Sequence, residues 1–183
     1  MGITIHYLGK LDDKEQIKTA SNELTEIAKE LEWKYELIND KKKGISGIVI
    51  KPHSKSESLS FIFDVNGELK NIVVLFHDDL LENDYSHVSI KTQFAPIEIH
   101  VTIIKLLRYL KKKFMGNLRV IDEGAYWDTS DEALLLEKFN FLNEMMDKLE
   151  NELNKLDKVE NESPESLADR IEVILKELQQ RKN

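Results

Sequence analysis

The sequence predicts an α+β fold: a two-layer arrangement of a mixed or antiparallel sheet with two helices on one face, followed by a C-terminal helical hairpin. Three features lead to this prediction. Short segments are rich in β-branched and aromatic residues, two longer segments between them repeat apolar residues at helical spacing, and the C-terminal segment repeats them in heptads. We expect an α+β domain over residues 1–128 and a hairpin tail over residues 129–183.

Composition narrows the functional classes. The chain has 183 residues, enough for one domain and a smaller second part, and its lack of cysteine excludes disulfides, thiolate-bound metals and cysteine nucleophiles. A formal net charge of −8 disfavours binding to nucleic acid or anionic lipid. The sequence starts without a signal-peptide pattern, and no apolar stretch approaches the about 20 residues that cross a bilayer. We therefore expect an acidic cytoplasmic protein without a membrane partner.

The first part of the domain is expected to be rich in strands. Residues 2–8 alternate as a strand, and an Asp12-x-x-Glu15 capping box precedes an amphipathic helix that extends to Leu31. Asn66-Gly67 supplies the two positive-φ positions of a tight hairpin turn, so the strands on either side of it should pair antiparallel. Further strands are expected at 33–38, 44–51, 59–64 and 69–76.

The second part of the domain should contain one strand, one helix and a last strand. The strand covers 87–93, the helix runs from Pro96 to about Phe114 with His100 on its apolar side, and the last strand covers 117–121. Basic residues occupy the other face and the end of this helix. They could contact phosphates, or they could complement the helix dipole and the acidic tail, which the net charge favours. These residues are Lys105, Arg108, Lys111, Lys112 and Lys113.

Heptad spacing in the tail predicts a self-associating helix. A second capping box at 129–132 precedes the heptad residues, and the polar segment 157–163 separates them from a second amphipathic helix. Two such helices can bury their apolar stripes, here called the seam, against each other, but few other apolar residues are left to form a core. We expect them to form a four-helix bundle with a second copy; folding back onto the sheet is the alternative. The seam residues are Leu135, Phe139, Leu142, Met146, Leu149, Leu153 and Leu156 in the first helix and Leu167, Ile171, Ile174 and Leu178 in the second.

Polar and aromatic residues follow the last two predicted strands of the domain. If these strands are neighbours, the residues would line one ligand pocket that holds a cation, two carboxylates, an imidazole and two aromatic rings. Asp122 and Glu123 could then act as general acid and base. In the alternative interpretation the acidic residues form a turn and the aromatic residues pack at the start of the tail. The candidate residues are Lys91, Gln93, His100, Asp122, Glu123, Tyr126 and Trp127.

The sequence predicts neither a metal site nor a cofactor. The five histidines lie on separate predicted elements, and no HxH, HExxH or HxxxH pair occurs. A GxSxG elbow and a Gly-rich phosphate loop are also absent from the sequence.

The segments KTQFAP and DEGAYWDT, with His100 between them, are distinctive. Together with the opening strand they resemble an uncharacterised bacterial protein family marked by KTQFA, a helix histidine and DEGxYWxT. The resemblance covers about residues 1–142 and implies a common structural unit without an activity. We therefore predict a non-enzymatic binding protein that forms a homodimer through its C-terminal helices and can bind a protein partner. The alternative is an enzyme that acts on a small polar or phosphorylated substrate at Lys91, His100, Asp122 and Glu123.

Overall fold

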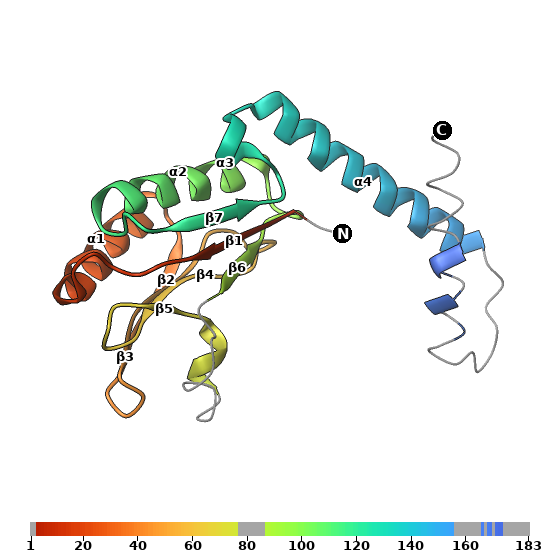
Figure 1. Cartoon of the computed structure of the whole chain (residues 1–183). Helices are drawn as coiled ribbons and strands as arrows, with labels where there is room; N and C mark the ends of the chain where they lie inside the picture. The colour runs from red at the N-terminus through yellow and green to blue at the C-terminus, as the bar shows by residue number, and fades with distance from the viewer. Residues whose placement is uncertain (1–2, 77–86, 156–165, 167, 170, 174–183) are drawn as a thin grey trace. The chain divides into compact units, whose positions relative to one another are not determined.

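A computed structural model describes residues 3–76, 87–155, 166, 168–169 and 171–173 (Figure 1). The chain divides into two compact units, Met1–Leu135 and Leu136–Asn183, which are described separately. The division falls within the long C-terminal helix, after residue 135. The predicted α+β class is confirmed.

One sheet has three strands, with β1 in the middle. β1 pairs antiparallel with β6 on one side and with β7 on the other, so β6 and β7 run in the same direction. Ile3, Ile5 and Tyr7 are buried, as the alternation of the opening strand predicts. The bounds are Thr4–Leu8 for β1, Val88–Lys91 for β6 and Arg119–Asp122 for β7.

The other sheet is a four-stranded antiparallel meander in the order β2-β3-β4-β5. The first helix packs against β2 and β3, and every residue of β4 is buried. At Gly47 a Cβ would lie 2.0 Å from the Phe61 carbonyl oxygen, so only glycine permits β3 to approach β4 this closely. The bounds are Lys34–Asp40 for β2, Ile45–Lys51 for β3, Leu59–Phe63 for β4, Leu69–Lys70 for β5 and Ile17–Glu30 for helix α1.

Two sheets replace the single sheet that we predicted. β6 and β7 occupy both edges of β1. No strand of the four-stranded meander can therefore pair with β1. Individual hydrogen bonds, rather than a ladder of paired strands, connect the two sheets. The Tyr7 hydroxyl donates to the Ser60 carbonyl at 2.7 Å and accepts the Ser60 amide at 3.1 Å, and the Leu69 amide donates to the Gly9 carbonyl at 3.0 Å.

The β4–β5 hairpin forms, but two details of its prediction are wrong. Of Asn66 and Gly67 only the glycine has a positive φ, of 80°. The predicted strand over 69–76 ends at Lys70, and Ile72–Leu75 is the 3₁₀ helix η2. The Asn71 side chain caps it by accepting the Val73 amide at 3.1 Å, and this local bond competes with strand formation.

The helices start close to where they were expected. Helix α2, Ile97–Lys113, follows Pro96 as predicted, and α1 follows the short 3₁₀ helix η1, Lys14–Gln16. Asp13 rather than Asp12 caps η1, because its Oδ1 accepts the Glu15 amide. α2 runs alongside β7 (Figure 1). None of the helices in the described part of the chain has the length and apolar character that crossing a bilayer requires.

The C-terminal region contains the short helix α3, Tyr126–Thr129, and the long helix α4, Glu132–Lys155. Asp131 caps α4 by accepting the amides of Ala133 and Leu134. Residues 166, 168–169 and 171–173 are helical. The polar turn at 157–163 and the seam residues Leu156, Leu167, Ile174 and Leu178 lie outside the described residues. The hairpin therefore stays a prediction.

Candidate functional site

The strand ends meet at one edge of the three-stranded sheet. β6 and β7 are not neighbours, as the pocket prediction required, because β1 lies between them. They nevertheless run in the same direction, so Thr92 after β6 and Asp122 at the end of β7 both reach His100 in the first turns of α2. The sheet topology thus brings together three polar side chains from distant segments.

Thr92, His100 and Asp122 form a buried relay of polar contacts. Thr92 Oγ1 lies 2.8 Å from His100 Nδ1, and His100 Nε2 lies 3.1 Å from Asp122 Oδ1. The direction of the Thr92–His100 hydrogen bond depends on the tautomer of the ring, and Thr92 Oγ1 also donates to the Ile3 carbonyl at 3.3 Å. Thr92, His100 and the Asp122 side chain have no exposed surface (0%). We name these three residues the buried relay.

Asp122 also organises the loop that follows it. Its Oδ1 accepts the Gly124 amide at 2.7 Å, and its Oδ2 accepts the Trp127 amide at 2.9 Å. Burial by itself would raise the pKa of Asp122, but the hydrogen bond and charge interaction with His100 and the two amide bonds outweigh it, so the pKa is lowered. Asp122 therefore stays ionised at neutral pH although its side chain is buried.

Gly124 allows the loop to close over the relay. A Cβ at this position would lie 2.6 Å from Leu135 Cδ1, 2.9 Å from His100 Nε2 and 3.0 Å from Asp122 Oδ1. All three distances are shorter than a normal van der Waals contact. The glycine in DEGAYWDT is thus required by close packing on the buried relay.

Arg108 holds α3 against α2. Its Nη2 donates to the carbonyls of Tyr126 and Trp127 at 2.9 and 2.7 Å and to Ser130 Oγ at 2.8 Å. The guanidinium also lies 5.6 and 5.7 Å from the centres of the two aromatic rings, within cation–π range. Burial and the neighbouring Glu132 carboxylate, which accepts the tyrosine hydroxyl at 3.3 Å, raise the pKa of Tyr126. Tyr126 and Trp127 thus both contact Arg108 of α2.

The remaining candidate residues make other contacts. Lys91 Nζ lies 5.6 Å from the ring centre of Phe94, and Glu123 Oε2 accepts the Thr4 amide at 2.8 Å. Gln93 is buried, and its Oε1 has no hydrogen-bond partner among the described residues. A ligand-binding role for the seven candidates stays a prediction.

Two described grooves lie away from the buried relay, between the start of α1 and the β2–β3 hairpin. Lys14 and Ile17 line both of them, and the larger has a volume of about 490 Å³. Within the described ranges, His, Asp and Glu side chains form no group of three that could hold a metal ion.

The basic face of α2 makes contacts within the first unit. Lys113 Nζ lies 2.6 Å from both carboxylate oxygens of Glu23, and Lys111 donates to the carbonyls of Gly116 and Leu118. With Arg108 bound to α3, three of the five predicted basic residues donate hydrogen bonds inside the unit, and one of them, Lys113, forms an ion pair. These partners belong to the first unit and not to the acidic tail, so complementing the tail stays a prediction.

Sequence analysis missed the roles of Thr92, Arg108 and Gly124. Thr92 and Gly124 belong to the two distinctive segments, so the segments themselves were the available signal. Arg108 was placed on the outer face, although it lies two turns after His100 and can reach the same loop. No protein-family model, curated protein or solved structure matches the chain.

Proposed function

We propose that the chain is a cytoplasmic, non-enzymatic interaction protein that forms a homodimer through α4. The proposal is supported by the burial of the side chains that could act as catalytic acid and base. A catalytic group must touch its substrate, whereas His100 and the Asp122 side chain have no exposed surface and contact each other. The relay instead connects α2 to the ends of β6 and β7.

The observation that carries the proposal is the apolar stripe of α4. Leu142, Met146 and Leu149 follow each other at heptad spacing, and Met146 keeps 46% of its surface exposed. The helix has 24 residues and is therefore about 36 Å long. Leu135 and Phe139, the first two residues of the predicted seam, are buried within the chain, so only the part of the seam from Leu142 onward can face a second copy. A partly exposed apolar stripe on a helix is typical of helices that pair with another helix.

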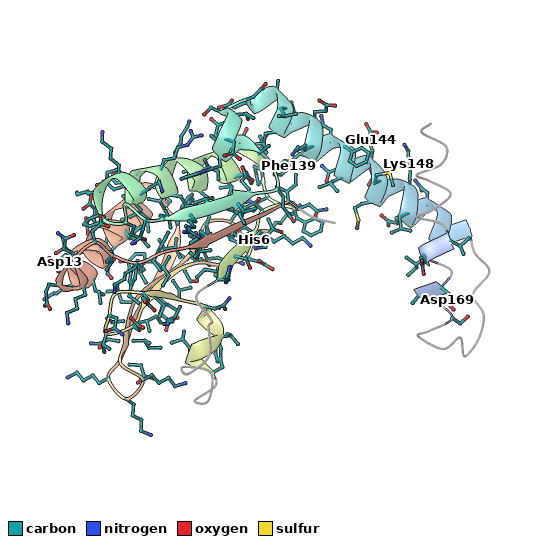
Figure 2. The ribbon with its side chains drawn as sticks, in the orientation of Figure 1. His6, Asp13, Phe139, Glu144, Lys148 and Asp169 are labelled. Carbon is teal, nitrogen blue, oxygen red and sulfur yellow. The ribbon has the colours of Figure 1, made fainter. Side chains whose placement is uncertain are left out.

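Residues beside the stripe favour a bundle over a two-stranded coil. Leu136 and Met145 occupy the flanking e and g heptad positions, which widens the apolar face. Leu136 is 47% exposed. Glu144 and Lys148 project from α4 in Figure 2, and their i,i+4 spacing suits the solvent side of a bundle helix. Two copies of α4, each with its following helix, would supply four helices.

Lysine substitutions on the two faces of α4 test the proposal. We expect the Leu142→Lys/Met146→Lys variant to lose mass in light scattering, because buried lysines weaken the seam by about 100-fold or more in the dissociation constant. The matched control Glu144→Lys/Asp147→Lys changes two exposed residues and should keep the wild-type mass. Far-UV circular dichroism should be the same for all three proteins. A monomeric wild type, or a seam variant with unchanged mass, would contradict dimerisation through α4.

A further inference from the structure

β2 is a long edge strand. It spans seven residues, and β3 is its only neighbour in the described sheet. Edge strands present a row of unpaired backbone N–H and C=O groups. The sheet's apolar face also continues to this edge: Tyr35 and Leu37 lie opposite the fully buried Ile50 and Ile48 of β3. Tyr35 and Leu37 are nevertheless 40% and 55% exposed.

We infer that β2 pairs antiparallel with β2 of a second copy of this chain, around a two-fold axis at Leu37. This self-pairing surface is separate from the α4 surface of the proposed homodimer, so chains that use both surfaces would assemble beyond a dimer. A two-fold axis perpendicular to the sheet places the central residue opposite itself, and Leu37 is the centre of the seven-residue strand. Full overlap then places Lys34 opposite Asp40 and Tyr35 opposite Asn39 of the second copy.

Charge complementarity selects this register. Lys34 is opposite Lys51 on the β3 side, so its cross-strand neighbour within the chain carries the same charge. Asp40 of the second copy would supply the opposite charge, once at each end of the paired strands. An axis at Glu36 would place two Glu36 carboxylates opposite each other, and an axis at Ile38 would place Glu36 opposite Asp40.

The leucine-centred register therefore avoids directly opposed like charges at full overlap. Glu36 would lie opposite Ile38 of the second copy, where its aliphatic stem can cover the partly buried isoleucine. The charges of Lys34 and Glu36 could also serve only to keep the edge free, or the edge could accept an extended segment of another protein. Neither alternative predicts that two copies of β2 pair with Leu37 opposite Leu37.

Disulfide crosslinking tests the register directly, because the chain contains no cysteine. In the Leu37→Cys variant the two Cβ atoms would lie about 4.5–5.5 Å apart, close to disulfide geometry. In the matched Tyr35→Cys variant, on the same face, the two cysteines would lie four residues apart along the strand, about 13 Å. Under mild oxidation at equal protein concentration we expect Leu37→Cys to form covalent dimers at least about tenfold faster.

A second arm tests the charge pairs. Lys34→Glu in the Leu37→Cys background should slow crosslinking several-fold, whereas Lys105→Glu, at an exposed position on α2, should not. Crosslinking should persist when Leu142→Lys/Met146→Lys is added, which separates this surface from α4. Equal rates for the two cysteine variants would indicate random collision, and absence of crosslinking would indicate an unpaired edge or another occupant. Either result overturns the inference.

Discussion

At the scale of single residues, His100 explains why a polar group can occupy the core of this protein. An unpaired buried imidazole or carboxylate would be strongly unfavourable. Here each ring nitrogen has a partner within 3.1 Å, and the Asp122 carboxylate accepts two backbone amides in addition. Burial of these groups is therefore compatible with stability, and it fixes the relative positions of α2, β6 and β7.

Gly124 provides the sharpest residue-scale prediction. We expect Gly124→Ala to lower the free energy of unfolding by about 1–3 kcal/mol, because the added methyl group must displace Leu135, His100 or Asp122. Urea denaturation followed by circular dichroism measures this change.

Gly116→Ala is the matched control. Its Cβ would meet the nearest atoms, the carboxylate oxygens of Asp12, at 3.5 Å, which is ordinary contact. The control should change the free energy of unfolding by about 0.5 kcal/mol or less. Equal effects of the two substitutions would show that close packing at Gly124 does not matter.

At the scale of elements, α3 depends on a side chain from another helix. It has only four residues, and Ala125 and Ser130 on either side have left-handed backbone conformations with φ of 63° and 55°. So short a helix is not stable by itself. Arg108 compensates by donating to two of its carbonyls and to Ser130.

Removal of the Arg108 guanidinium should therefore loosen α3 selectively. We expect Arg108→Ala to lower the free energy of unfolding by about 1.5–3 kcal/mol, the range for hydrogen bonds to charged groups. Hydrogen exchange should show loss of protection at the amides of Thr129 and Ser130, which bond to Ala125 and Tyr126. Lys105→Ala, on the same helix, is the control. Unchanged protection in Arg108→Ala would show that α3 is held by packing of its rings alone.

At the scale of the whole molecule, the lowered pKa of Asp122 makes stability depend on pH. The folded state binds a proton on this carboxylate less readily than the unfolded state, whose pKa is about 3.9. In the window below that value the unfolded state binds more protons, so stability rises with pH. The contribution of Asp122 is complete well above about pH 3.9 and is lost as the pH falls through the folded pKa.

Asp122→Asn tests this linkage. The variant should be less stable than the wild type at neutral pH, and the difference should shrink as the pH falls through this window. Chemical denaturation at a series of pH values gives both curves. Asp128→Asn, at an exposed carboxylate of α3, is the control for removal of one negative charge and should be about as stable as the wild type at neutral pH. A difference between wild type and Asp122→Asn that does not change with pH would contradict the assignment.

The sequence by itself determined the local features of this protein. Alternation placed β1, β3 and β6, helical spacing placed α1 and α2, and Pro96 marked the start of α2 with His100 on its buried side. Each of these features depends on neighbours within a few residues of the chain. The seven candidate residues were selected in the same way, by their position near the ends of two predicted strands or on the helix between them.

Only the tertiary structure decided which segments meet. Periodicity shows which face of a strand is buried but not which strand lies beside it, so the division into two sheets and the position of β1 between β6 and β7 were not predictable. The contacts of His100 with Thr92 and Asp122 follow from that order. They join residues far apart in the sequence, and the bonds form because the sheet brings the strand ends to one edge.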